Sequence, residues 1–369
     1  MRTSGIEYEP RLEEKKELAP FPSKFSDTLL SEIGDYFEDA FPYRKAIVSE
    51  LKINLQKISS PYRAGFFKIL SEKLYPSRKS ADGSYFLAPL QEGEVLYGKN
   101  GWLFFAGENN IDHYLNKTPF SAEDLYNAGE AASELGSICN AKDIRLAFII
   151  PPSKEQIYSE YMPGLIPASG ASRAEVLENY IVKNYDLNII YPKHELENFK
   201  NICDLYYTQD SHWNRAGALI GIRCIYDLLG IPFSDVDISR ICQEDMIGGD
   251  LSNFCGYMTR YLDYYFDYKP EIKPEVTESA AGPFVFEAYN KDAEGRLVLI
   301  GDSFRTNMEN YLAKDFKYVT VSHFMAANSD EIICALRSLK KGDVLIIEST
   351  ERYDDLFAER CRLVSGLIS

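Results

Sequence analysis

The sequence predicts an α/β fold of three layers (αβα), in which helices cover both faces of a mostly parallel sheet. From residue 120 onward, short apolar runs typical of buried strands alternate with longer stretches of helical periodicity. Strands that alternate with helices favour a parallel sheet, because a parallel return requires a long crossover. Such a sheet places its ligand beyond the carboxyl ends of its strands. The predicted strands are Ile144–Ile150, Leu187–Tyr191, Leu297–Ile300, Val319–Val321 and Val344–Ile347.

Capping signals delimit the helices between these strands. Ser121 can cap a helix that runs to about residue 140, and Ser172 with Glu175 makes a capping-box pattern before a second helix. A third helix is expected over 214–229, where Gly230 ends it. Two further helices are expected, one over 305–313 and one from Ser329 to near Gly342.

The chain before this pattern has a different character. Residues 1–24 are expected to be disordered, and residues 25–84 are expected to form an N-terminal helical segment of two helices separated by Pro42. The α/β domain would then occupy residues 85–369. Within it, residues 245–290 are rich in Tyr, Phe, Pro and Gly and show no clear helix, so we expect an insertion with long loops, in which a hairpin is one option.

Charge and composition exclude several classes of function. The chain of 369 residues has a formal net charge of −16, which disfavours nucleic acid and anionic lipid as partners. Its seven cysteines form no Cys-x-x-Cys pair and its four histidines are scattered, so we expect neither a metal nor a cofactor. No apolar run of 18 residues and no opening signal peptide occur. We therefore expect one of two cases: the protein is cytoplasmic, or an upstream export or anchor segment is missing from this sequence.

The sharpest chemical feature is the turn Gly301–Phe304. It follows the apolar strand Leu297–Ile300 and precedes a helical stretch, which places Ser303 at the carboxyl edge of the sheet. A serine on such a strand-to-helix turn is exposed, and nearby backbone N–H groups can stabilise developing negative charge. The alternative interpretation is a serine that only caps a helix. The strand–turn–helix context favours a nucleophile.

A candidate base lies just before the helix over 214–229. A hydroxyl nucleophile needs a base within hydrogen-bonding reach, and the base needs a carboxylate to orient it. Asp210 and His212 stand two residues apart, which in an extended segment directs both side chains to the same side. A lone histidine there is otherwise a capping or surface residue. The pairing with Ser303 is what favours catalysis.

The other three histidines are weaker candidates. His113 is expected in a polar loop and His194 in a charged turn. His323 ends the strand that follows the helix after Ser303, so it could reach the edge of the site and is retained as an alternative base.

Together these motifs resemble the SGNH-hydrolase-like family of alginate O-acetylation proteins and the related DHHW proteins. The resemblance depends mainly on Gly301–Ser303, on Asp210–Trp213 and on Gly98–Phe104. Three further segments support it and extend it over about residues 25 to 353: Tyr36–Arg44, Pro152–Tyr158 and Ile346–Arg352.

This resemblance implies a function that spacing alone does not. Members of the family use Ser, His and Asp to move acetyl groups onto exported polysaccharides of the bacterial cell envelope. They work outside the cytoplasmic membrane, often anchored by an N-terminal segment, and a membrane-bound acyltransferase usually delivers the acetyl group. Carried over, Ser303 would be the nucleophile, His212 the base and Asp210 its orienter. The anchor would lie in a segment absent from this chain.

The chain also departs from the family pattern. Ser211 stands where the DHHW proteins have a second histidine, and the chain shows no separate carbohydrate-binding domain after residue 353. Glycan affinity would then come from the main domain, for which the aromatic stretch 257–268 is a candidate. Glu348 and Arg352 are expected to form a structural ion pair. Candidates for oxyanion or substrate binding are Asn328, Asn307, Lys154, Tyr158 and Trp213.

Three functions remain open at this point. The first is a serine-dependent O-acetyltransferase that forms an acetyl-serine intermediate and acts on a polysaccharide. The second is a carbohydrate O-acetyl esterase with the same triad, since transfer exceeds hydrolysis only if the site favours sugar over water. The third is a non-catalytic glycan-binding module that has kept the fold.

Overall fold

The computed structural model describes residues 91–369, apart from residues 93, 163–169, 234–235, 256–259, 278, 280 and 281. The expected disordered stretch 1–24 and the expected helical segment 25–84 lie outside the described residues. Within the described part of the chain, no helix is both long and apolar enough to span a bilayer.

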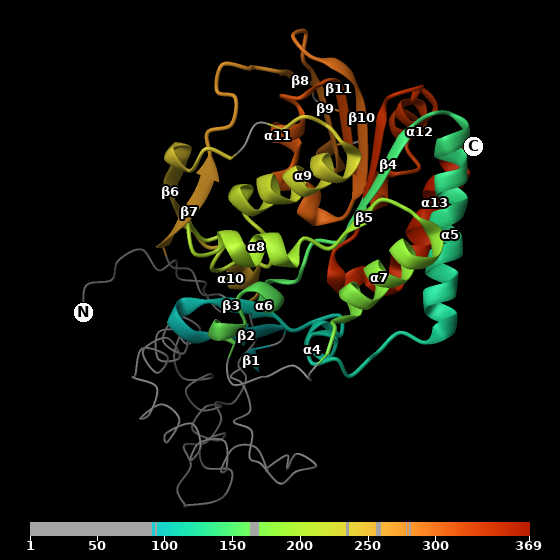
Figure 1. Cartoon of the computed structure of the whole chain (residues 1–369). Coiled ribbons are helices and arrows are strands. Elements are labelled where there is room, and N and C mark those ends of the chain that lie inside the picture. Colours follow the sequence, from blue (N-terminus) through green and yellow to red (C-terminus); the bar gives the residue numbers. More distant parts are fainter. Residues whose placement is uncertain are drawn as a thin grey trace, which may run out of the picture.

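The centre of the fold is a seven-stranded sheet with the order β5-β4-β12-β10-β11-β9-β8 (Figure 1). The first five strands in this order are mutually parallel, and β9 and β8 continue the sheet antiparallel. The predicted three-layer fold with a mostly parallel sheet is therefore confirmed. The strand bounds are β4 Arg145–Ile149, β5 Ile189–Ile190, β8 Glu275–Thr277, β9 Val285–Tyr289, β10 Glu294–Gly301, β11 Phe316–His323 and β12 Val344–Glu348.

The two faces of the sheet form two separate hydrophobic cores. Successive side chains of a strand point to opposite faces, so in β12 Val344 and Ile346 join one core while Leu345 and Ile347 join the other. Helices α8 (Lys193–Phe199) and α9 (Arg215–Leu229) pack on the first face. On the second face lie α5 Ala122–Ala141, α7 Arg173–Tyr185, α12 Asp330–Arg337 and α13 Phe357–Ile368.

The capping signals read from the sequence operate as expected. Ser121 and Ser172 each complete a capping box at the start of α5 and α7. Gly230 ends α9 in the left-handed conformation, with φ of 62°, which costs glycine no steric energy. The C-terminal helix α13 was not among our expectations, although Phe357, Cys361, Val364 and Ile368 recur on one buried face.

Two expected helices differ from the structure. The stretch over 305–313 is a 3₁₀ helix, Ser303–Asn307, followed by the one-turn helix α11, Glu309–Leu312. The helix after Ser329 ends at Arg337, before Gly342, because Leu339 turns into the core and the Asp343 carboxylate accepts a hydrogen bond from Lys340 N. The expected strand Leu187–Tyr191 is likewise shortened to two residues, Ile189–Ile190, which form β5.

The aromatic-rich region contains more regular structure than we expected. Strands β6 (Ile241–Ile247) and β7 (Arg260–Phe266) pair as an antiparallel hairpin. Between them lies the short helix α10, Asp250–Cys255, so the expectation of no helix was wrong. The end of the same region supplies β8 and β9 to the central sheet. These short, half-exposed segments carry little hydrophobic periodicity, so the sequence pattern did not reveal them.

A small three-stranded sheet lies beside the hairpin. It comprises β1 (Gln91–Glu92), β2 (Val95–Tyr97) and β3 (Leu103–Phe105), all antiparallel. Leu251 and Cys255 of α10 form a separate small core with β2 and β3. This core fixes α10, and with it the tip of the hairpin, against the main domain.

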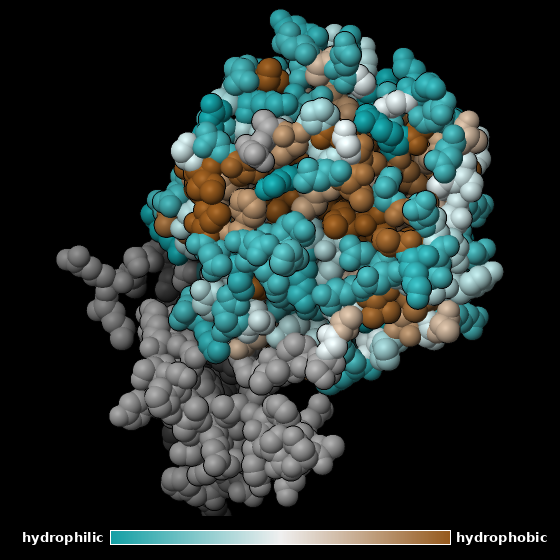
Figure 2. All heavy atoms as spheres, in the orientation of Figure 1, coloured by the Kyte–Doolittle hydropathy of each residue, from teal (hydrophilic) through white to brown (hydrophobic). Residues whose placement is uncertain are grey.

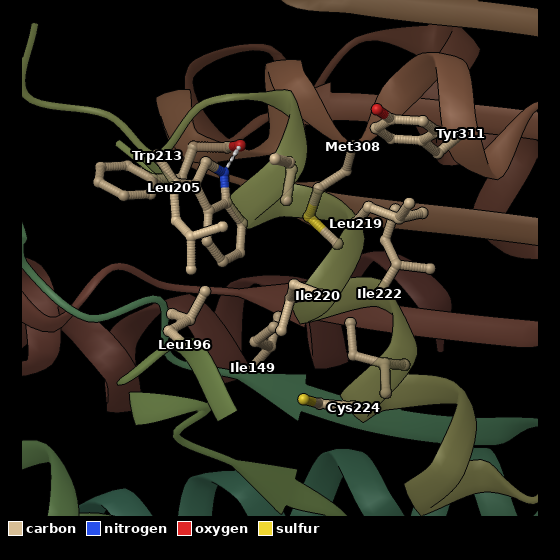
Figure 3. Close-up of a cluster of buried hydrophobic side chains, with 14 of the residues drawn as sticks. Ile149, Leu196, Leu205, Trp213, Leu219, Ile220, Ile222, Cys224, Met308 and Tyr311 are labelled. Carbon is tan, nitrogen blue, oxygen red and sulfur yellow. Dashed lines mark hydrogen bonds between the residues drawn. The ribbon is translucent and has the colours of Figure 1, made fainter. Parts of the chain in front are cut away.

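Helix α9 fills the core on the first face of the sheet. Trp213, just before the helix, points into this core among Leu205, Ile149 and Ile220 (Figure 3). A Cβ at Gly221 would overlap the Trp213 ring, so glycine lets the helix approach the indole. On the outside, apolar residues form a broken band at the level of α9, and polar side chains cover α8 (Figure 2).

Candidate active site

The turn at Ser303 begins where β10 ends, between the parallel neighbours β12 and β11. A Cβ at Gly301 would overlap the carboxyl group of Glu348 in β12, so glycine is needed for the strands to approach here. Asp302 accepts a hydrogen bond from Phe304 N at 3.2 Å and from Thr350 N at 2.9 Å. These contacts fix the backbone on both sides of the Ser303 side chain.

Two buried carboxyl groups, those of Asp302 and Glu348, stabilise this turn. Asp302 N donates to Glu348 Oε2 at 2.8 Å, and Asp302 Oδ2 lies 3.1 Å from Nη1 of Arg360. Burial alone would raise the pKa of Asp302, but the Arg360 charge and the hydrogen bonds from Thr350 hold it below its usual value. Burial, followed by the neighbouring Asp302 charge, raises the pKa of Glu348 well above its usual value. The two carboxyl groups at this turn thus have pKa values shifted in opposite directions.

His212 meets Ser303 from the opposite side. Its Nε2 lies 2.6 Å from Ser303 Oγ, and its Nδ1 lies 2.6 Å from Asp210 Oδ1. The tautomer that satisfies both contacts carries its proton on Nδ1, donates it to Asp210 and accepts the Ser303 hydroxyl proton. The structure thus brings together the three side chains expected from the sequence, in the arrangement that general-base activation of a hydroxyl requires.

Asp210 is held as a carboxylate. Its Oδ1 also accepts the backbone N–H of His212 at 3.0 Å, and its Oδ2 accepts the N–H of Asp250 at 2.9 Å. Burial alone would raise the pKa of Asp210. The side-chain hydrogen bond to His212, the charge of the His212 ring and these backbone donors instead lower the pKa of Asp210 below its usual value. An ionised Asp210 would stabilise an imidazolium at His212.

Lys154 and Tyr158 both contact the loop that carries His212 through hydrogen bonds to its backbone, and their expected role in substrate binding stays a prediction. The ammonium of Lys154 is buried and donates to the carbonyls of Tyr207, Thr208 and Asp210 at 3.0, 3.3 and 2.7 Å. Burial lowers the pKa of Lys154 to about 8. The hydroxyl of Tyr158 accepts the Leu205 N–H at 2.8 Å inside the core.

The side chains of Trp213 and Asn307 form hydrogen bonds between the segment that carries His212 and the segment that carries Ser303. Trp213 Nε1 donates to the carbonyl of Phe304 at 2.8 Å, and Asn307 Nδ2 donates to the carbonyl of Trp213 at 2.7 Å. Because these bonds link segments that follow His212 and Ser303, they fix the spacing between these two side chains. Asn328, the other oxyanion candidate, is exposed just before α12.

Glu348 and Arg352 do not form the ion pair we expected. Glu348 faces the Ser303 turn, whereas the Arg352 guanidinium lies over the rings of Phe105 and Phe304, 5.0 and 5.5 Å from their centroids. Glu348 is the last residue of β12, whereas Arg352 lies in the following 3₁₀ helix, Glu351–Leu356, where the chain has left the sheet.

The remaining histidines lie in other environments. His323 Nδ1 accepts the backbone N–H of Met325 at 3.2 Å, so it acts as a cap at the end of β11. His113 is buried in the short helix α4 (Asn110–Tyr114), contrary to the expected polar loop, and His194 lies on α8 beside Asn198. Neither replaces His212 at Ser303.

The residue that sequence analysis missed is Asp250. Its carboxylate accepts the N–H and the hydroxyl of Ser211 at 2.7 and 2.6 Å, and Oδ2 lies 3.5 Å from His212 Nδ1. The only sequence signal is Gly248–Asp250, a turn pattern before a short helix, and nothing in it indicates the triad.

Two groups of side chains place potential metal ligands close together. Within the described residues, these are Asp210, His212 and Asp250, and His113, Asp354 and Asp355, with ligand atoms within 4.8 Å of one another in each group. Hydrogen bonds already engage the carboxylates of the first group. In the second group the guanidinium of Arg173 pairs with both aspartates. We therefore interpret both groups as hydrogen bonds and ion pairs between protein side chains.

Comparison with known proteins supports the family resemblance. Residues 95–331 match the family model described as "SGNH hydrolase-like domain, acetyltransferase AlgX". A comparison with curated proteins gave no significant match. The chain is similar in structure to Bacillus cereus PatB1 with a sulfonyl adduct, at 17% identity and a TM-score of 0.51, over 73% of this chain and 99% of that chain.

Two further solved structures are similar at lower scores. The O-acetyltransferase domain of Pseudomonas putida AlgJ has 15% identity and a TM-score of 0.44, over 72% of this chain and 93% of that one. A DHHW family protein from Eubacterium siraeum has 12% identity and a TM-score of 0.46, over 75% and 97%. At such identities the likeness concerns the fold. Because the family model covers well over half of its residues, the chain belongs to the family of SGNH hydrolase-like domains of the acetyltransferase AlgX.

Proposed function

We propose that this protein is a serine-dependent O-acetyltransferase that acts on an exported or cell-surface polysaccharide through an acetyl-serine intermediate. One observation carries the proposal: the hydrogen-bonded series Asp210–His212–Ser303, at the carboxyl edge of the sheet in an acetyltransferase-type domain. The contacts that hold the His212 imidazole against the Ser303 hydroxyl leave Nε2 of that ring with no second hydrogen-bond partner among the described residues.

The first half-reaction loads the enzyme. Ser303 Oγ attacks the acetyl carbonyl carbon of the donor while His212 Nε2 takes the hydroxyl proton. Asp210 stabilises the resulting imidazolium, and the backbone N–H of Ser303 can donate to the oxyanion. Collapse of the tetrahedral intermediate breaks the bond to the leaving group, which takes the proton from His212. Acetyl-Ser303 and the free leaving group remain.

The second half-reaction reverses these roles on a sugar. A sugar hydroxyl loses its proton to His212 Nε2 as its oxygen attacks the acetyl carbonyl carbon. The bond to Ser303 Oγ then breaks, and the proton passes from His212 to that oxygen. The acetylated sugar departs and the triad regains its first state. If water replaces the sugar, the same steps give acetate, which is the reaction of a carbohydrate esterase.

The setting of this reaction belongs to the same proposal. A polysaccharide acceptor agrees with the family, whose described activity is acetyl transfer. We place the protein outside the cytoplasmic membrane, in the periplasm or at the cell surface. There a membrane-bound acyltransferase would supply acetyl groups, and a segment outside this chain would anchor it.

Product analysis tests the proposal against its two rivals. The protein is incubated with an activated acetyl ester and oligosaccharides, and acetylated sugar and free acetate are both quantified. We expect acetylated sugar from the wild type and none above background from Ser303→Ala. Ser137→Ala, which changes an exposed serine on α5, is the matched control.

Each rival predicts a different result. Acetate without acetylated sugar would indicate the esterase. Unchanged biological activity in Ser303→Ala would indicate the non-catalytic module.

A further inference from the structure

Asp250 reaches the triad from a distant part of the chain. It is the first residue of α10, in the connection between β6 and β7 of the hairpin. Forty residues separate it from Asp210, to which its backbone N–H donates at 2.9 Å. The hairpin region therefore contributes directly to the surroundings of His212.

The contact between Asp250 and the catalytic loop is reciprocal. Asp210 Oδ2 accepts the N–H of Asp250, while Asp250 Oδ1 accepts the N–H of Ser211 at 2.7 Å. Asp250 Oδ2 also accepts the Ser211 hydroxyl at 2.6 Å. Three hydrogen bonds thus fix the peptide between the orienting carboxylate and the imidazole, and each has a charged acceptor, which makes it stronger than a neutral one.

Asp250 also faces the imidazole itself. Its Oδ2 lies 3.5 Å from His212 Nδ1, compared with 2.6 Å for Asp210 Oδ1. Among the described residues, these two are the carboxylates within 4.0 Å of a His212 ring nitrogen. The ring therefore lies between two negative charges on its Nδ1 side and the Ser303 hydroxyl on its Nε2 side.

The position of Asp250 is fixed by packing. A Cβ at the preceding Gly249 would overlap Asp210 and the carbonyl of Gln209, so the two segments are in close contact. The N–H of Ser252 donates to that same carbonyl at 3.2 Å. Leu251 is fully buried against the small sheet. A side chain held on both sides in this way cannot drift from the triad without moving α10.

The other charged or titratable groups around the His212 loop form hydrogen bonds or ion pairs with groups other than the His212 ring. Lys154, from α6 (Lys154–Ile157), donates to the loop carbonyls, and Arg215 of α9 pairs with Asp263 and Glu244. The phenols of Tyr207 and Tyr261 donate to Asn307 and to the carbonyl of Gly248.

We infer that Asp250 is a second carboxylate of the catalytic centre, a positioning residue that holds the Asp210–His212 segment and stabilises the imidazolium formed during acetyl transfer. The inference rests on the proposed function. Asp250 forms no covalent bond and takes no proton: the Ser303 proton moves to His212 Nε2, and the Nδ1 proton stays on the ring. Its charge matters only while the ring is positive, which is the condition for lowering a barrier.

Two substitutions separate position from charge. Asp250→Asn keeps the size of the side chain and removes its charge, and Asp250→Ala removes both. Asp245→Asn, an exposed aspartate on β6 of the same hairpin, is the matched control. For each, the rate of Ser303 acetylation by an activated ester is followed across pH, with KM for the ester and the melting temperature.

The expected results are graded. Asp250→Ala should lower the acetylation rate by about 10- to 100-fold, less than the roughly 10⁴-fold loss typical of a triad's main orienting carboxylate. KM for the ester should stay unchanged. Asp250→Asn should give an intermediate loss and move the rising limb of the pH–rate profile to lower pH, because the imidazolium loses the stabilisation of a nearby negative charge. Asp245→Asn should behave as wild type.

An NMR readout keeps this inference separable from the proposed function. The ring resonances of His212 are recorded in wild type, Asp250→Asn and Asp245→Asn. A change confined to Asp250→Asn, with its rate loss, supports the inference. Wild-type rates, pH profile and ring resonances in Asp250→Asn would overturn it. If the wild type never acetylates Ser303, the proposed function fails, and the resonances alone decide whether Asp250 acts on the ring.

Discussion

Asp302, the residue before Ser303, forms a buried ion pair with Arg360 of α13, with Oδ2 and Nη1 3.1 Å apart. The guanidinium also donates to Ser349 Oγ at 2.6 Å. A helix on one face of the sheet thus supports the turn at Ser303 through an ion pair. The pair links the stability of the C-terminal helix to the geometry of the site.

Removing the cation of this pair should destabilise the protein strongly. In Arg360→Gln the buried carboxylate of Asp302 loses the guanidinium that pairs with it. Breaking a buried pair in this way typically costs about 3–5 kcal/mol. Denaturant unfolding at neutral pH measures the loss, and Arg362→Gln, at an exposed position of the same helix, is the control. A loss no greater than that of the control would show that the pair does not stabilise the turn.

A methyl group at Gly301 should disturb both the sheet and the nucleophile. Its Cβ would overlap the buried carboxyl of Glu348, and overpacking of this kind typically costs about 1–3 kcal/mol. Because Ser303 is two residues away, Gly301→Ala should also lower the rate of Ser303 acetylation. Gly366→Ala, at a position with open space on α13, should leave the rate unchanged. Wild-type stability and rate in Gly301→Ala would contradict the assigned contact.

Glu351 gives the fold a measurable pH dependence. It is buried and accepts hydrogen bonds from Ser153 N, Gln156 and Tyr191, and burial raises its pKa from 4.5 to about 8. The folded protein therefore keeps this proton at pH values where the unfolded chain has lost it. The resulting stabilisation is complete below pH ~4.5 and disappears as the pH rises through ~8.

The variant Glu351→Gln cannot titrate at this position. Its free energy of unfolding relative to wild type should increase between pH 5 and pH 8, on the order of 3 kcal/mol. Denaturant unfolding at several pH values gives both curves, with Glu359→Gln as an exposed control on α13. Curves for Glu351→Gln and wild type that stay parallel over this range would show that Glu351 is already ionised at pH 5.

Tyr158 should act on stability and not on substrate. Tyr158→Phe leaves the buried N–H of Leu205 without its 2.8 Å acceptor, a loss of about 1–3 kcal/mol. KM for the acetyl ester and for the sugar should remain those of the wild type. Thermal unfolding and steady-state kinetics test this together, with Tyr126→Phe at an exposed position as the control. A raised KM without loss of stability would restore the substrate-binding role expected from the sequence.

The sequence was sufficient where periodicity and caps are strong. The runs around Phe148, Leu299 and Ile346 predicted the parallel strands, because strands buried on both faces are apolar throughout. The order of strand, turn and helix placed Ser303 at the sheet edge, and the position of His212 before α9 placed it at the same edge. Local patterns could therefore predict a contact between residues 91 positions apart.

The sequence was insufficient where tertiary contacts decide. Asp250 reaches His212 only because α10 packs on β2 and β3, and no local pattern encodes that docking. Lys154 and Tyr158 looked like site residues because they follow a strand end, yet their polar atoms point to backbone groups of the 205–210 loop. Strand β9 depends on pairing with β11, and β8 on pairing with β9, and periodicity does not identify such partners.

The central claim concerns the contact of 2.6 Å between His212 Nε2 and Ser303 Oγ. Mass spectrometry of peptides after brief treatment with an activated acetyl ester tests it most directly, in wild type, His212→Ala and the control His194→Ala. An added 42 Da on the peptide that contains Ser303 is expected in wild type and His194→Ala, and its formation should slow by about 10²–10⁴-fold in His212→Ala. Acetylation of Ser303 at the wild-type rate in His212→Ala, or an adduct on another residue in the wild type, would contradict the account.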